Sequence, residues 1–224
     1  MFDNSLKTVV VSGASGLVGS KLMELLCENV TVKKIIVLSR RPLEFENPKV
    51  QVVLTDFTRL QAFQGKLEGA DVMYCCIGTT IKKAGSRDAF RKVDYQIPYD
   101  LASLASRAEI PKLIIISSIG ASPGSKNFYL RVKGEMERDI SADFRFQKLA
   151  FLRPSLLLGD RQEFRFIERI MQLLMYLFSF VFVGRFARYR PVSDQTVAKA
   201  MISISNSVNN QKVYESVELP WLGR

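Results

Sequence analysis

Residues 11–19 read VSGASGLVG, and glycine recurs in them at every third position. The apolar run Thr8–Val11 leads into this segment, and leucines at helical spacing follow it from Leu17 onward. A strand, a glycine-rich turn and a helix in this order are typical of dinucleotide-binding folds, in which the helix N-terminus supplies N–H donors and a positive dipole for phosphate. We therefore predict a phosphate-binding turn, in preference to a turn whose glycines serve structure alone.

The three glycines of this turn have different predicted tasks. Gly13 permits the tight turn, Gly16 lets the backbone approach a pyrophosphate, and Gly19 allows close packing of the helix on the strand. Three glycines alone would be weak evidence. Their place between a strand and a helix, near the N-terminus of the chain, makes the pattern specific.

The rest of the chain alternates short apolar runs with stretches of helical spacing, such as the one from Phe90 to Ala108. This alternation predicts an α/β fold, a doubly wound parallel sheet of the Rossmann-like type with helices on both faces. We expect one domain over residues 1–224, in which residues 160–224 contribute a small C-terminal cap on the substrate side. The further predicted strands are Ile35–Leu38, Val50–Leu54, Asp71–Cys76, Leu113–Ile116, Phe146–Leu152 and a late one near Val213–Tyr214, which follows a helix from Ser193.

Composition excludes several classes of catalyst. The 224 residues carry a formal net charge of +10 and include no histidine. Without histidine, Ser-His-Asp and Cys-His catalysis and zinc sites built on imidazole are ruled out, and we expect no metal. The positive charge suits nucleic acid, an anionic membrane surface or a phosphorylated ligand. We expect no nucleic-acid partner, because the chain contains no known nucleic-acid-binding module.

Cysteine usage and the N-terminus bear on the compartment. The three cysteines cannot all be paired, and Cys75 and Cys76 are adjacent, which indicates a reducing environment without a disulfide framework. The first residues lack the basic start and the apolar stretch of a signal peptide. We therefore predict a cytoplasmic location, with attachment to the periphery of a membrane as the alternative.

The end of the second predicted strand bears on the choice of dinucleotide. NAD-preferring sites place Asp or Glu there, to bond the ribose 2′-hydroxyl. This chain has Arg40 and Arg41 instead, and guanidinium groups match phosphate oxygens. We therefore predict NADP(H), although one or both arginines could be solvated surface residues. Asp56, just after the third strand, is placed to contact an adenine ring, or to cap the helical segment that follows it.

A second group of residues predicts proton transfer. Ser117 and Ser118 end the fifth strand, and Tyr129 and Lys133 follow with the i, i+4 spacing that puts them on one helix face. A nearby cation favours the phenolate form of a tyrosine, so Tyr129 could exchange a proton with a substrate oxygen that Ser118 also binds. The alternatives are a surface Tyr and Lys on an amphipathic helix and, for Ser117, a hydroxyl that satisfies the backbone at the strand end.

These motifs resemble the short-chain dehydrogenase/reductase superfamily, and within it the small atypical members of the HIV Tat-interactive protein oxidoreductase-like group. The resemblance covers most of the chain. It implies a Rossmann fold with Ser, Tyr and Lys at one site. The segments that carry it are Val11–Gly19, Cys76–Thr80, Ala84-Gly85, Phe90–Asp94, Ser117–Ala121, Tyr129–Glu135 and Leu152–Arg161.

The resemblance also implies where the cofactor lies. Bound NADP(H) is expected at the strand ends, close to Gly13, Ser15, Gly16, Leu17, Arg40, Asp56 and Gly78. By the same analogy Lys133 contacts the ribose and Pro154 lies near the nicotinamide. Many extended relatives have Asn where this chain has Asp94, so no catalytic amide is carried over to that position.

The last third of the chain differs in composition. Residues 164–186 are rich in Phe, Leu, Met and Arg, but their most apolar part spans about 14 residues, which is too short to cross a bilayer. We expect this segment to cover the substrate side or to pack against a second copy of the chain. Contact with a membrane surface is the alternative.

Together these features predict an NADP(H)-dependent oxidoreductase. It would move a hydride between the nicotinamide and a carbonyl or alcohol substrate of unknown identity, with Ser118, Tyr129 and Lys133 as the catalytic residues; use of NAD(H) stays open. The alternative is an NADP(H)-binding regulator or assembly protein without turnover. A sugar-nucleotide epimerase or dehydratase is a third, less favoured hypothesis.

Overall fold

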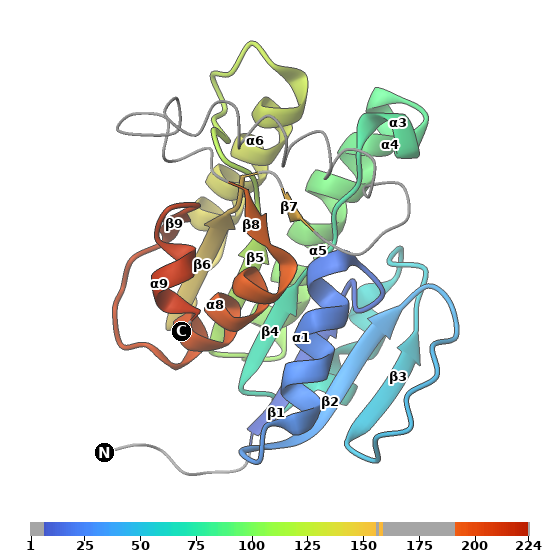
Figure 1. Ribbon diagram of the computed structural model, residues 1–224. Coiled ribbons are helices and arrows are strands. Elements are labelled where there is room, and N and C mark those ends of the chain that lie inside the picture. Colours follow the sequence, from blue (N-terminus) through green and yellow to red (C-terminus); the bar gives the residue numbers. More distant parts are fainter. Residues whose placement is uncertain (1–6, 156, 159–190, 224) are drawn as a thin grey trace.

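The computed structural model describes residues 7–155, 157–158 and 191–223. Its centre is a parallel sheet of seven strands in the order β3-β2-β1-β4-β5-β6-β9, with helices around it (Figure 1). This arrangement confirms the predicted Rossmann-like α/β fold. The strands are β1 (Lys7–Ser12), β2 (Val32–Ser39), β3 (Val50–Leu54), β4 (Val72–Cys75), β5 (Lys112–Ile116), β6 (Lys148–Arg153) and β9 (Val213–Glu215).

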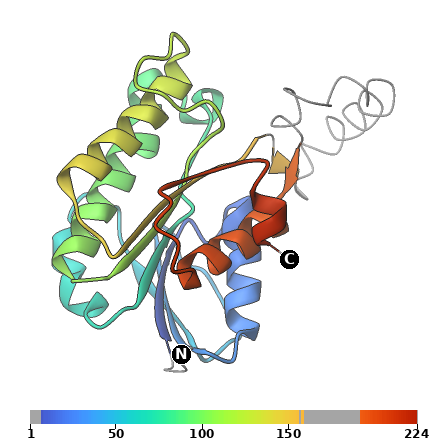
Figure 2. The same ribbon diagram turned by 90° about the vertical axis from the view of Figure 1, so that its left-hand side faces the viewer.

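Helices cover both faces of the sheet, which explains why its strands are continuously apolar (Figure 2). Successive residues of β1 point to opposite faces: Val9 and Val11 pack in the core on the α1 and α8 side, and Val10 packs in the core on the α5 and α6 side. The longer helices are α1 (Leu17–Glu28), α5 (Ile97–Arg107), α6 (Phe128–Asp143) and α8 (Asp194–Asn206). The shorter helical segments are η1 (Leu60–Phe63), α2 (Gln64–Leu67), α3 (Ile81–Ala84), α4 (Arg87–Arg91), the π-helical η2 (Lys92–Gln96) and α9 (Leu219–Leu222).

The strand order reverses beside β1. The chain runs from β1 outward to β2 and β3, and then crosses to β4, β5 and β6 on the other side. In open parallel sheets, ligands bind at the carboxyl ends of the strands where the order reverses. The loops after β1 and β4 meet at this point, and the Cys76 N–H donates a hydrogen bond to the Ser12 carbonyl oxygen at 2.9 Å. This edge of the sheet is therefore the expected place of the site.

Three polar pairs align α6 with the helical segment formed by α4, η2 and α5. They are Arg91–Glu135, Tyr95–Asp139 and Tyr99–Asp143, and each tyrosine Oη donates a hydrogen bond of 2.7 Å. Each pair follows the previous one by four residues on both helices, so the two helices run parallel and in register. Burial, together with the hydrogen bond to Asp139, raises the pKa of Tyr95 to about 12. This register determines where α6 presents Tyr129 and Lys133.

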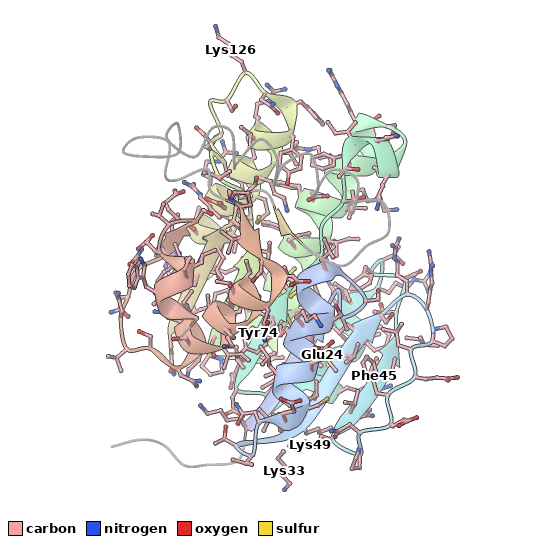
Figure 3. All side chains as sticks on the ribbon, viewed as in Figure 1. Glu24, Lys33, Phe45, Lys49, Tyr74 and Lys126 are labelled. Atoms are coloured by element: carbon pink, nitrogen blue, oxygen red, sulfur yellow. The ribbon has the colours of Figure 1, made fainter. Side chains whose placement is uncertain are left out.

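The helix predicted from Ser193 is α8. Ser193 is its N-cap, and the Ser193 Oγ accepts a hydrogen bond from the Thr196 N–H at 3.1 Å. Tyr74 of β4, labelled in Figure 3, holds α8 to the sheet, because its Oη lies 2.7 Å from Ser205 Oγ. Just before α8, Val192–Ser193 (β8) pairs with Leu157–Leu158 (β7) in a separate parallel sheet that was not predicted.

The predicted cap, residues 160–224, is described only from residue 191 to residue 223, and the segment 164–186 lies outside the described residues. The predictions of membrane or dimer contact through that segment therefore stay predictions. In the parts of the chain that the structure does describe, no helix combines the length and the apolarity that a membrane crossing requires.

Candidate functional site

The turn after β1 is closed so tightly that Gly13 and Gly19 leave no room for a side chain. Gly13 has a φ of +81°, and a Cβ there would lie 2.7 Å from the carbonyl carbon and oxygen of Cys76. A Cβ on Gly19 would lie only 2.0 Å from the Gly13 oxygen. The Gly16 N–H donates a hydrogen bond to this same oxygen at 2.9 Å. The glycine spacing thus brings the start of α1 against both the turn and the loop after β4.

No side chain caps the N-terminus of α1. The N-cap residue is Gly16. The first N–H groups of a helix have no partner within the helix, and with the helix dipole they bind phosphate. Ser15 is exposed and Leu17 is half-buried at this end. The geometry therefore suits the predicted contact with a pyrophosphate.

Arg40 and Arg41 lie immediately beyond β2 at the same edge of the sheet. Both are exposed, and neither forms an ion pair with another described residue. The Ser39 Oγ donates to the Arg41 carbonyl oxygen at 2.8 Å and accepts from the Arg41 N–H at 3.2 Å. The local turn therefore holds the backbone while both guanidinium groups stay available, which fits a 2′-phosphate and also fits solvated arginines.

Asp56 closes a turn of its own. Its Oδ1 accepts from the Thr58 N–H at 2.9 Å and from the Thr58 hydroxyl at 2.7 Å. The backbone hydrogen bond from Thr58, followed by that from the hydroxyl, lowers the pKa of Asp56. The next helical segment begins at Leu60 with Arg59 as its N-cap, so the expectation that Asp56 caps it is wrong. Phe57, the residue after Asp56, is buried and has a left-handed backbone conformation with a φ of 63°, which residues other than glycine rarely adopt.

Lys133 is buried, and its ammonium has a partner that the sequence did not predict. The Lys133 Nζ lies 2.8 Å from Asp94 Oδ1, and the two side chains are 3% and 1% exposed. Burial by itself lowers the pKa of Lys133, but the Asp94 carboxylate and then Tyr129 raise it, and the net pKa lies above the ordinary value. Lys133 therefore enters the site as an ammonium ion that is paired with a carboxylate.

Tyr129 lies one helical turn before Lys133 on the same face of α6. Its side chain is half-buried, and its ring packs against that of Phe90, with 5.3 Å between the ring centroids. Phe90 itself is fully buried and also contacts Phe128. This aromatic support restricts how the phenol can move at the start of α6.

The serines differ in their surroundings. Ser118 is half-buried, whereas Ser117 is buried and its Oγ has no hydrogen-bond partner among the described residues. The expectation that the Ser117 hydroxyl satisfies the strand-end backbone is therefore wrong; only its N–H does so, by donating to the Leu152 oxygen at 2.7 Å. The Ile119 N–H donates to the Pro154 oxygen at 3.0 Å, so the loop after Ser118 lies beside Pro154.

The loop after β4 connects the turn to Lys133. Cys76 lies against Gly13, and a Cβ on Gly78 would lie 3.4 Å from Asp94 Oδ1 and 3.8 Å from Lys133 Nζ. The structure thus brings the glycine turn, Gly78 and Lys133 together. Arg40, Arg41 and Asp56 follow β2 and β3 at the same edge, and no hydrogen bond or ion pair in the described part of the chain joins them to Lys133.

The close packing of α6 against the loop after β5 is a second feature that sequence reasoning missed. A Cβ on Gly134 would lie 2.2 Å from the Ser122 carbonyl carbon and 2.4 Å from the Pro123 nitrogen. The loop after β5 therefore touches the helix one residue beyond Lys133. The available signal was the glycine itself, because a glycine inside a helix is unfavourable by about 1 kcal/mol relative to alanine and needs a packing reason.

The Cys75 thiol is buried in the core, and Cys27 and Cys76 are partly buried against it. Burial raises the pKa of Cys75 and of Cys27, and it raises that of Cys76 well above the ordinary value. Reactive cysteines have a lowered pKa and are accessible. The geometry therefore assigns these side chains to packing.

Comparison with known proteins identifies the family. Residues 13–164 match a family model described as NAD(P)H-binding. The chain belongs to this NAD(P)H-binding family. Protein HTATIP2 of Rattus norvegicus is 38% identical over 168 residues, which are 73% of this chain and 68% of the relative. Protein FMP52, mitochondrial, of Meyerozyma guilliermondii is 34% identical over 196 residues, or 86% of this chain and 83% of the relative. The protein is thus an atypical member of the short-chain dehydrogenase/reductases, as the resemblance implied.

Solved structures of this type share the fold. An ADP-L-glycero-D-manno-heptose-6-epimerase of Helicobacter pylori superposes with a TM-score of 0.70 at 20% identity, covering 94% of this chain and 76% of the epimerase. MoeE5 in complex with UDP-glucose and NAD superposes with a TM-score of 0.67 at 16% identity, covering 92% and 74%. At this level of identity the likeness extends to the fold alone.

Proposed function

We propose that the protein is an NADP(H)-dependent oxidoreductase that acts on a carbonyl or alcohol substrate through Ser118, Tyr129 and Lys133. The observation that carries the proposal is the chain of close contacts from Gly13 through Cys76 and Gly78 to Lys133. These contacts join a phosphate-binding turn to a Tyr-Lys pair at one edge of the sheet. When bound, the dinucleotide would supply the hydride.

The residues at this edge fit such a cofactor. A Cβ on Gly13, Gly16 or Gly19 would meet backbone within 3.1 Å, so the glycines let the turn close tightly at the start of α1, where the helix N–H groups can bind a pyrophosphate. In our proposal Ser15 and Leu17 line this turn, Arg40 and Arg41 hold the 2′-phosphate, and Asp56 contacts the adenine. Gly78 and Pro154 lie on the nicotinamide side, where Lys133 donates to the ribose.

Side chains of the protein carry out the proton transfer. In the direction of reduction, the Tyr129 Oη gives its proton to the substrate carbonyl oxygen while Ser118 Oγ donates a hydrogen bond to that same oxygen. The phenolate that remains on Tyr129 is stabilised by the Lys133 ammonium one turn away. In the direction of oxidation, the phenolate takes the proton back from the alcohol.

The compartment of the protein can be tested directly. Lys126 lies at the tip of the loop before α6 and is directed away from the body of the protein (Figure 3). A cytoplasmic location stays a prediction, and the FMP52 relatives carry the word mitochondrial in their names. Fractionation of cells that express the tagged protein distinguishes the two.

The first prediction concerns the choice of dinucleotide. Titration with NADPH and NADH, followed by nicotinamide fluorescence, should show tighter binding of NADPH. Arg40→Ala should weaken NADPH binding by about 10-fold or more, because a charge-assisted contact to phosphate is lost, and should leave NADH binding unchanged. Arg107→Ala, at the exposed C-terminal end of α5 and far from the carboxyl edge, is the control that should match the wild type.

The outcomes separate the hypotheses. Equal affinities for the two dinucleotides would discard the 2′-phosphate role of Arg40 and keep NAD(P)(H) binding. Binding of neither by the folded protein would contradict the oxidoreductase and the NADP(H)-binding regulator alike, and would leave a Rossmann-like fold whose role is to bind a partner.

A further inference from the structure

Asp94 lies in an irregular turn inside a long helix. From Arg87 to Arg107 the chain is helical throughout, but Lys92–Gln96 forms a π-helical turn between α4 and α5. A single π-turn inside an α-helix is unusual, and such turns occur frequently at functional sites. Asp94 is at the centre of this turn and is fully buried.

Both carboxylate oxygens of Asp94 are used, and by different segments. Oδ1 lies 2.8 Å from the Lys133 Nζ on α6, and Oδ2 accepts from the Thr79 N–H at 2.9 Å. Thr79 follows Gly78 in the loop after β4, which also contacts Gly13 through Cys76. One carboxylate therefore ties together the helical turn, the lysine and the loop that leads to the glycine turn.

Stability does not explain why this pair is buried. Removing two charges from water costs several kcal/mol per ion, and apolar residues of the same volume are often at least as stabilising as a buried ion pair. A buried pair does hold its two groups in one geometry, because separating them leaves an uncompensated charge in the interior. The arrangement therefore fits a requirement for a lysine that is both charged and fixed in position.

The groups around Lys133 leave Asp94 as its counter-charge. Among the described residues, the ionisable groups that act most strongly on its pKa are Asp94 from η2, Tyr129 from α6 and the Cys75 thiol from β4. Burial lowers the pKa of Lys133, and Asp94 provides the largest opposing effect. An asparagine at position 94 would keep the same shape and the bond to Thr79, but it would provide no charge.

We propose that Asp94 is a positioning residue of this site, which keeps Lys133 protonated and directed toward the ribose and Tyr129. The inference rests on the proposed function. The functional unit is then a Tyr129–Lys133–Asp94 triad. The carboxylate stands where many extended relatives have an amide, and it acts through the lysine, without touching the substrate.

The first test needs no cofactor. The ammonium resonance of Lys133 is followed by NMR as the pH is raised, and is assigned by its absence from Lys133→Met. We expect the pKa of Lys133 to be lower in Asp94→Asn than in the wild type. The matched control is Asp143→Asn, which removes an exposed carboxylate from the far end of α6 and should leave the Lys133 titration unchanged. Equal Lys133 titrations in wild type and Asp94→Asn would overturn the proposal.

The second test asks whether the pair serves the site. Asp94→Asn should bind NADPH about 10-fold more weakly than the wild type, because a misplaced or neutral Lys133 loses a charge-assisted hydrogen bond to the ribose. Asp143→Asn should bind as the wild type does. If Asp94→Asn shifts the Lys133 titration while NADPH binding and turnover stay at wild-type values, the pair is structural and the proposal fails. If the wild type itself binds no NADPH, the proposed function fails, and the cofactor-free titration reports separately on the pair.

Thermal unfolding covers the case in which Asp94→Asn folds poorly. Leaving Lys133 buried without its partner should lower the Tm by about 10 °C. Asp94→Asn/Lys133→Met, which contains no unpaired charge, should recover most of that loss. If the double variant shows the sum of the two single losses, the residues are not coupled and the proposal is overturned.

Discussion

Tyr129→Phe should bind NADPH as tightly as the wild type and lose turnover by about 10²- to 10⁴-fold, the usual contribution of a general acid or base. The substitution removes only the phenol oxygen, and the ring keeps its place beside Phe90 at 5.3 Å. The measurement is NADPH oxidation at 340 nm with a carbonyl substrate found by screening, alongside a fluorescence titration of NADPH. A loss of turnover with unchanged NADPH binding would assign the proton transfer to the Tyr129 phenol.

The chain offers a close control for this experiment. Tyr95→Phe removes a phenol that donates to Asp139 between two helices, so it should lower stability slightly and leave turnover unchanged. Unchanged turnover in Tyr129→Phe would exclude the phenol as the proton donor. Equal losses of turnover in both variants would indicate that each substitution disturbs the packing of α6 as a whole.

Most of the sheet could be predicted because each strand is marked by a short apolar run of consecutive residues. The strands lie where short apolar runs stand in the sequence, since strands covered on both faces need such runs. The predicted bounds of β3 are the observed ones, and the other predicted ends differ by at most three residues. Phe146 packs against the core on the α5 and α6 side although it precedes β6. The β7–β8 pair contains two residues in each strand, and segments so short leave no periodicity to detect.

The sequence predicts the residues of the site only where those residues are close to one another along the chain. Tyr129 and Lys133 share one helix face by their i, i+4 spacing, and the glycine turn is contiguous. The ion pair between Asp94 and Lys133 joins residues on different helices, and Asp94 lies in a π-turn inside what the pattern predicts as one regular helix. Such a turn depends on a tertiary contact, so helical periodicity cannot reveal it.

The glycine turn supports the other large prediction, in which Gly19→Ala disables the protein. A Cβ on Gly19 would lie 2.0 Å from the Gly13 oxygen and 2.8 Å from the Gly13 carbonyl carbon, which are backbone atoms that no rotamer change can move. The turn must open or α1 must shift, and either movement displaces the first N–H groups of the helix. We expect a loss of about 3 kcal/mol in the free energy of unfolding and NADPH binding weakened by at least about 10-fold.

Gly65→Ala provides the comparison that isolates this effect. Gly65 is also helical, in α2, but a Cβ there would meet no atom within 4 Å. Alanine is favoured over glycine in a helix by about 1 kcal/mol, so Gly65→Ala should be neutral or stabilising and should bind NADPH normally. Urea unfolding and the fluorescence titration measure both quantities for each variant. If Gly19→Ala behaved like Gly65→Ala, α1 would not be packed on the turn, and the phosphate-binding role of residues 11–19 would lose its structural basis.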